Sequence, residues 1–89
     1  MKSVVFYETQ ATGMDQVMAV FPRHAAYTEA FIARGELIAV GTFADPIKDG
    51  SMAVFRDRAS AEAFIAGDPF VLEKLVKPTI KDWNEKLLK

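Results

Sequence analysis

Cysteine is absent from this sequence, and histidine occurs only once, at position 24. Without thiols the chain has no disulfide, no thiol nucleophile and no thiolate-ligated metal. One histidine cannot build a multi-histidine metal site, and the carboxylates lack the spacing of metal ligands. Glycine is also sparse, and no segment has the pattern of a phosphate-binding loop or a serine nucleophile elbow. We therefore expect no metal and no cofactor.

Neither sign of charge dominates, since 11 basic and 12 acidic side chains leave a formal net charge of -1. This balance provides no electrostatic footprint for nucleic acid or for an anionic membrane. No apolar run reaches the roughly 18 residues that span a bilayer, and the opening "MKSVVFYETQ" turns polar too early for a signal peptide. We expect a cytoplasmic protein whose partners include neither nucleic acid nor membrane.

The residues that are present predict one globular domain over residues 1–89, because 51% of them are hydrophobic. β-branched and aromatic residues predict a first strand at 3–8. Apolar residues then recur at helical spacing, but Pro22 interrupts them, and proline favours the first turn of a helix. We therefore expect a short helical lead-in at 14–20 and a main helix at 22–34, ended by Gly35.

The second half of the chain continues with two more strands, a helical segment and a last strand. Ser60 is the expected N-cap of a short helix that Gly67 ends, and Asp68 then caps a new start with Pro69 in its first position. The expected elements are strands at 36–43, 51–56 and 79–83, a loop at 44–50 and a short helix at 61–66. The order is β-α-β-β-α-β, the ferredoxin-like α+β arrangement with an antiparallel sheet.

Both faces of this sheet are predicted to be apolar. Side chains alternate along a strand, so Val4 and Phe6 oppose Val5 and Tyr7, and the next two strands alternate in the same way. Two helices cover one face only. We expect the other face to pack on that of a second chain across a two-fold axis, which gives a homodimer. The alternation leaves open whether Leu37 or Ile38 faces the partner.

Two residues are candidates for acid–base chemistry. In the expected helix at 22–34, His24 lies in the first turn, where free N–H groups favour the neutral imidazole that a general base needs. From the residues alone, the favoured interpretation is an ordinary exposed residue of a first turn. Asp68 is an N-cap by its position before proline. Its carboxylate has two oxygens, so one can cap the helix while the other orients His24.

The residues around these candidates resemble the YciI-like, or YCII-related, domain family. The resemblance extends over essentially all 89 residues and is carried by "PRHAAYTEAFIARG", "LIAVGTF", "SMAVFR", "SAEAFIAGDPFV" and "IKDWNE". It implies a ferredoxin-like fold that dimerises into an α/β barrel, with His24 and Asp68 as the catalytic pair. Many members have Gly-Pro-Phe where this chain has Gly-Thr-Phe, so Thr42 adds a hydroxyl near the pocket.

The resemblance implies a cofactor-free enzyme of lyase, dehydrochlorinase or isomerase type acting on a small cyclic or aromatic molecule. The expected substrate-binding residues are Thr42, Phe43, Ser51, Phe70 and Trp83, although each aromatic also suits a core or an interface. Two alternatives remain. The pocket could bind an unknown small ligand without catalysis, or it could be vestigial in a structural or partner-dependent protein.

Overall fold

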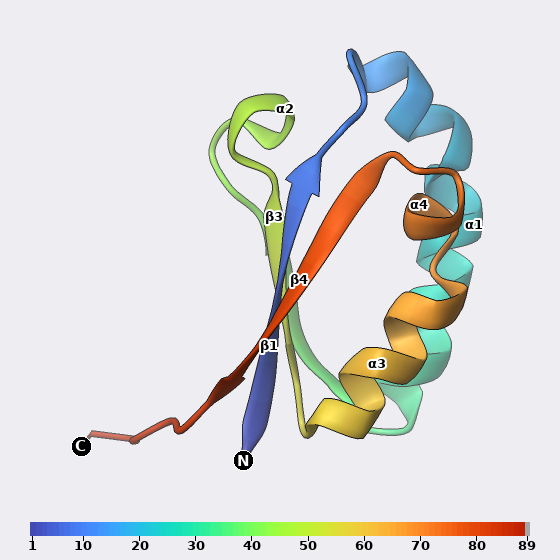
Figure 1. Ribbon diagram of the computed structural model, residues 1–89. Coiled ribbons are helices and arrows are strands. Elements are labelled where there is room, and N and C mark those ends of the chain that lie inside the picture. The colour runs from blue at the N-terminus through green and yellow to red at the C-terminus, as the bar shows by residue number, and fades with distance from the viewer. Residues whose placement is uncertain (89) are drawn as a thin grey trace.

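The computed structural model describes residues 1–88 as a four-stranded antiparallel sheet with its two long helices packed on one side (Figure 1). The elements in chain order are β1 (Lys2–Thr9), α1 (Met14–Ala33), β2 (Leu37–Thr42), α2 (Pro46–Asp49), β3 (Ser51–Phe55), α3 (Arg58–Gly67), α4 (Pro69–Leu72) and β4 (Val76–Trp83). The strand order β2-β3-β1-β4 is that of a ferredoxin-like fold, which confirms the predicted fold class. No helix within residues 1–88 is long and apolar enough to cross a membrane.

The last strand begins earlier than predicted. It starts at Val76, and Pro78 lies inside it, opposite Tyr7 of β1. Proline has no N–H to give to a sheet ladder, so it is tolerated within a strand mainly at a sheet edge. β4 is an edge strand, and its other side has no neighbouring strand among the described residues. The predicted strand began three residues later, at residue 79.

Helix α1 is continuous, and the prediction that Pro22 divides this segment in two is wrong. The helix extends from Met14 to Ala33 with Pro22 inside it. Proline there removes one hydrogen bond to the carbonyl of Met18. Both residues are exposed, and Val20, Thr28 and Phe31 anchor the helix to the core from either side of the interruption. Gly35 then ends the helix with a φ of 72°, as predicted.

His24 consequently lies in the middle of α1 and not in a first turn. The free N–H groups of a helix N-terminus are about ten residues away, and their partial charge falls off within one turn. The expected stabilisation of the neutral ring by this partial charge is therefore wrong. The protonation of the His24 imidazole therefore depends on residues that pack against the middle of the helix.

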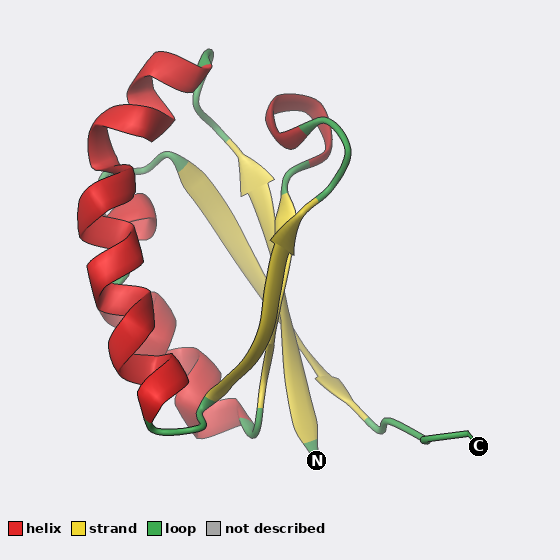
Figure 2. Ribbon diagram, turned by 180° about the vertical axis from the view of Figure 1, so that it is seen from behind, coloured by secondary structure: helices red, strands yellow, loops and turns green. Residues whose placement is uncertain are grey.

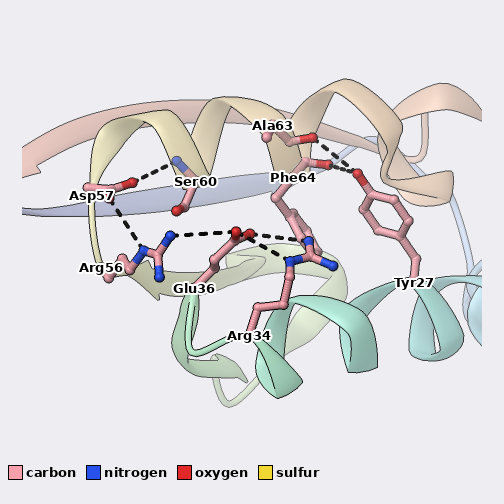
Figure 3. Close-up of polar contacts among 8 residues, drawn as sticks. All are labelled: Tyr27, Arg34, Glu36, Arg56, Asp57, Ser60, Ala63 and Phe64. Carbon is pink, nitrogen blue, oxygen red and sulfur yellow. Dashed lines mark hydrogen bonds and ion pairs between the residues drawn. The ribbon is translucent and has the colours of Figure 1, made fainter.

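Two short helical segments differ from the predictions, and each begins at an aspartate N-cap that was not predicted. The predicted loop at 44–50 contains helix α2, whose N-cap Asp45 accepts a hydrogen bond from the Lys48 N–H at 3.1 Å. Helix α3 starts three residues before its predicted start at Ala61. Its N-cap is Asp57, whose carboxylate accepts the N–H of Ser60 at 2.8 Å (Figure 3). Ser60 is thus the third helical residue, and the more acidic Asp57 takes the capping role.

The core lies between the sheet and helices α1 and α3. It consists of Val5, Tyr7, Phe31, Leu37, Ala53, Phe55, Ala61 and Phe64. Phe64 is at its centre, with its ring 5.0 Å from that of Phe31 and 5.2 Å from that of Phe55. Tyr27 joins α1 to α3 because its hydroxyl donates to the backbone carbonyls of Ala63 and Phe64 (Figure 3).

The opposite face of the sheet is not covered by α1 or α3, and the short helix α2 lies only at the ends of the strands (Figure 2). A register shift between Leu37 and Ala39 makes Ile38 an extra residue in β2. Leu37 is buried beneath the helices at 5% exposure, whereas Ile38 is 49% exposed, which settles their orientation in one chain. On the central strand Phe6 is 39% exposed, with the Lys81 ammonium 5.7 Å from its ring centre.

Candidate active site

A cavity of about 400 Å³ opens between α1 and the ends of the strands at which α2 lies. Its α1 wall is formed by Met14, Val17, Met18, Phe21, His24, Ala25, Thr28 and Glu29, and its opposite wall includes Tyr7, Val40, Thr42, Ser51, Ala53, Asp68 and Phe70. The walls are mainly apolar with a few polar groups, as in typical small-molecule sites. This size suits a ligand of one or two rings.

His24 and Asp68 meet at this cavity although 44 residues separate them. His24 projects from the middle of α1, and Asp68 lies at the junction where α3 ends and α4 begins. The Nδ1 atom of His24 is 2.8 Å from Oδ1 of Asp68. The side chain of Asp68 is 1% exposed and that of His24 is 17% exposed. A buried carboxylate therefore holds a histidine at the edge of an apolar cavity.

Asp68 also caps α4, as predicted, but with the same oxygen. Its Oδ1 accepts the backbone N–H of Phe70 at 3.0 Å in addition to the His24 bond. The expectation that one oxygen caps while the other orients the histidine is thus wrong. A single oxygen can do both because each carboxylate oxygen has two lone pairs that accept hydrogen bonds. Its second oxygen, Oδ2, is buried without a hydrogen-bond partner among residues 1–88.

The contacts of His24 determine which nitrogen is available for chemistry. An ionised carboxylate only accepts, so the bond to Asp68 places a hydrogen on Nδ1, and in the neutral form of the ring Nε2 then carries the lone pair. The ring stacks on Phe70 with centroids 4.0 Å apart and an angle of 16° between the planes. The His24 ring also meets the Phe64 ring edge to face, with the two centroids 6.3 Å apart. These contacts hold the imidazole in one orientation, as an acid–base group requires.

Tyr7 is a cavity residue that the sequence-based interpretation missed. Its side chain is 7% exposed, it lines the cavity from β1, and its hydroxyl has no hydrogen-bond partner in the described part of the chain. Burial, and secondarily the charge of Asp68, raises the pKa of Tyr7 well above its ordinary value of 10.0. The hydroxyl therefore stays protonated. Strand alternation placed Tyr7 on the same face as Val5 without saying which face the helices cover, and an unsatisfied hydroxyl is visible only after folding.

The predicted substrate-binding residues separate into two groups. Thr42, Ser51 and Phe70 line the cavity together with the His24–Asp68 pair, and Thr42 pairs with Ser51 across β2 and β3. Phe43 follows the end of β2 and borders a different hollow, which Phe6 and Thr79 also line.

Trp83 does not lie at the mouth of the cavity. It pairs with Lys2 at the start of β1, whereas the cavity is lined by Tyr7 and Thr9 at the end of that strand. Trp83, named above as a substrate-binding residue, is therefore not among the residues that line the cavity, because β4 runs antiparallel to β1 and carries its last residues away from the cavity. Within residues 1–88 there is no group of three histidine or acidic side chains positioned to hold a metal ion.

The chain belongs to the YCII-related domain family, whose model matches residues 1–84. This confirms the resemblance found in the sequence motifs. A search of curated proteins found no match.

Two solved structures share the fold. One is a 5-chloro-2-hydroxyhydroquinone dehydrochlorinase from Burkholderia phenoliruptrix AC1100 in complex with 2,5-dihydroxybenzoquinone, at 22% identity and a TM-score of 0.70, with 97% of this chain and 96% of that chain covered. The other is a mutant of a cofactor-independent oxygenase from Streptomyces nogalater, at 18% identity and a TM-score of 0.54, with 99% and 96% covered. At these identities the likeness shows the fold alone.

Proposed function

We propose that the protein is a cofactor-free enzyme that moves a proton on a small cyclic or aromatic substrate, with His24 and Asp68 as its catalytic pair. The observation that carries this proposal is the 2.8 Å contact between His24 Nδ1 and a buried carboxylate oxygen at the edge of an apolar cavity. Thr42, Ser51 and Phe70 are the proposed substrate-binding residues, since they line the same cavity.

In this mechanism His24 Nε2 takes a proton from the substrate, and Asp68 stabilises the imidazolium that forms. The electron pair left on the substrate then has two outcomes. It expels a leaving group, such as chloride, so that the elements of an acid are lost. Alternatively the proton returns at another carbon, so that the substrate is isomerised. Both outcomes balance without an oxidant or reductant, which suits a site built from one histidine and one carboxylate.

The reaction of the dehydrochlorinase of similar fold supports the first outcome and a ring substrate. A cavity of about 400 Å³ has room for such a ring. The same pocket also suits a ligand-binding module without catalysis. Turnover separates these two functions, whereas a binding measurement does not.

The test is chloride release from 5-chloro-2-hydroxyhydroquinone, followed with a chloride electrode and by absorbance. We expect turnover by the parent chain and a loss of about 10²–10⁴-fold in His24→Ala, the usual contribution of a positioned acid–base group. Arg23→Ala is the matched control, since Arg23 precedes His24 in the same helix but its side chain is 61% exposed. Equal rates for parent and His24→Ala, or no turnover with ligand binding retained, would refute the catalytic role.

We also propose that the active form is a homodimer. The uncovered face of the sheet presents Phe6 from β1, and Ile38 is exposed in the edge strand β2, which β3 separates from β1. Covering this face with that of a second copy would remove apolar surface from water. Each cavity lies on the helix side of its own sheet, so dimerisation would leave it accessible.

A further inference from the structure

Two buried polar atoms of the cavity lack hydrogen-bond partners among residues 1–88: the hydroxyl of Tyr7 and Oδ2 of Asp68. Both side chains line the cavity, and their exposures are 7% and 1%. Buried polar groups are nearly always hydrogen-bonded, since a group that is neither paired nor hydrated destabilises the fold. Such atoms in a binding cavity indicate that a ligand supplies the missing bonds.

The two atoms have complementary chemistry. The carboxylate oxygen only accepts a hydrogen bond. The Tyr7 hydroxyl can donate one, because burial and the charge of Asp68 raise the pKa of Tyr7 and keep it protonated. They do not bond to each other. A ligand group that satisfies both must donate one hydrogen bond and accept another, and a hydroxyl does this with a single oxygen.

We propose that Tyr7 and Asp68 together bind one hydroxyl group on the ring of the substrate. The ligand O–H donates to Asp68 Oδ2, and its oxygen accepts from the Tyr7 hydroxyl. The ligand class is a phenol or a hydroquinone in its neutral form, because a phenolate would face the carboxylate with like charge and no hydrogen to donate. This inference rests on the proposed function in taking the cavity as the substrate site, and it makes Tyr7 a specificity-determining residue.

The experiment compares two probes that differ by one group, 4-methylphenol and 1,4-dimethylbenzene. Their binding is measured by calorimetry or by NMR titration with the parent, Tyr7→Phe and Tyr27→Phe chains. Tyr27→Phe is the matched control, since the Tyr27 hydroxyl donates to backbone carbonyls of α3 outside the cavity. We expect the parent and the control to prefer the phenol. Tyr7→Phe should bind the phenol about tenfold more weakly and 1,4-dimethylbenzene unchanged.

The ligand-free chains provide a second readout. Tyr7→Phe removes a buried hydroxyl that lacks a partner, so its Tm should rise by about 4–8 °C. Tyr27→Phe loses bonds that exist, so its Tm should fall. A lower Tm in Tyr7→Phe would show that water already satisfies the hydroxyl, which overturns the inference.

Unchanged affinity of Tyr7→Phe for the phenol, or no preference for the phenol in the parent, also overturns it. Either result leaves the proposed function standing if His24→Ala still loses turnover. In the converse case, Tyr7→Phe loses the preference for the phenol but His24→Ala turns over the substrate as fast as the parent. That result refutes the catalytic role of His24 and leaves the hydroxyl-binding inference standing.

Discussion

At the scale of single residues, Asp68 has two structural tasks on one oxygen atom. Oδ1 accepts from His24 Nδ1 and from the Phe70 N–H. The sequence pattern Asp-Pro predicted the second bond, because it is a local capping arrangement. The first depends on a contact across 44 residues, which the residues alone left as one of two interpretations and which the family resemblance implied. The cap was thus predictable from local chemistry, whereas the choice of His24 as partner needed the resemblance.

The two tasks separate in two substitutions of Asp68. Asparagine keeps an oxygen for capping but loses the charge that stabilises an imidazolium, so Asp68→Asn should fold and lose turnover. Asp68→Ala loses both acceptors and should lower the free energy of unfolding by about 1–3 kcal/mol. Urea denaturation and chloride release measure the two effects.

Asp45→Ala is the control for the capping loss, because Asp45 also precedes a proline and caps α2 but does not contact His24. Its turnover should match that of the parent. An Asp68→Asn chain with the turnover of the parent would contradict the proposed role of the carboxylate.

At the scale of secondary structure, α1 shows how a sound local rule failed. Proline disfavours a helix interior, and the prediction divided the segment at Pro22 for that reason. The rule did not include the packing of Val20 before the proline and of Thr28 and Phe31 after it. These anchors hold both halves of the segment in one helix, and the lost hydrogen bond lies between two exposed residues. Tertiary packing therefore overrode the local preference.

A continuous helix makes Pro22→Ala a stabilising change. Alanine restores the N–H, and interior proline costs about 3 kcal/mol relative to alanine. Part of this gain is offset because proline also restricts the unfolded chain. We expect the free energy of unfolding to rise by about 1–2 kcal/mol in urea denaturation. Pro69→Ala, in the first position of α4 where proline fits, should change little. A destabilised Pro22→Ala chain would indicate two separate helices.

The N-cap of α3 predicts a defined pH dependence. Hydrogen bonds from the backbone N–H and the hydroxyl of Ser60 lower the pKa of Asp57 below its ordinary value of 3.8. A lowered folded pKa means that the contribution of Asp57 is complete above the ordinary value and is lost as pH falls through the folded one. The substitution Asp57→Asn retains a side-chain oxygen that can cap the helix but removes the carboxyl group that titrates. Urea midpoints measured between neutral pH and pH 2 should therefore fall less steeply for Asp57→Asn than for the parent, and parallel curves would contradict this.

At the scale of the whole molecule, alternation along the strands predicted the sheet, its two faces and the helices on one of them. It could not assign Leu37 and Ile38, because the register shift in β2 breaks the alternation at that point. It also could not place Trp83, whose distance from the cavity depends on how β4 pairs with β1. The missing information in both cases is strand register, which is determined by contacts between distant segments.

Dimerisation through the uncovered face is tested by sedimentation equilibrium at micromolar concentration. We expect twice the mass of one chain for the parent and the mass of one chain for Phe6→Glu, which places a charge on the central strand of that face. Ile32→Glu is the control, since Ile32 is exposed to a similar extent, 47% against 39% for Phe6, but lies on α1. A monomeric parent would refute the dimer, and dissociation by Ile32→Glu would place the interface on α1.

Because a single carboxylate oxygen accepts both the Phe70 N–H and His24 Nδ1, the backbone of α4 is coupled to the state of the imidazole. When the ring gains a proton or a ligand draws it away, the electron density that this oxygen offers to the Phe70 amide must change. The Phe70 amide resonance is therefore a natural reporter of events at the cavity. An unmodified, isotopically enriched sample would reveal a true ligand by a shift of this one signal, and Asp68→Ala would abolish that response.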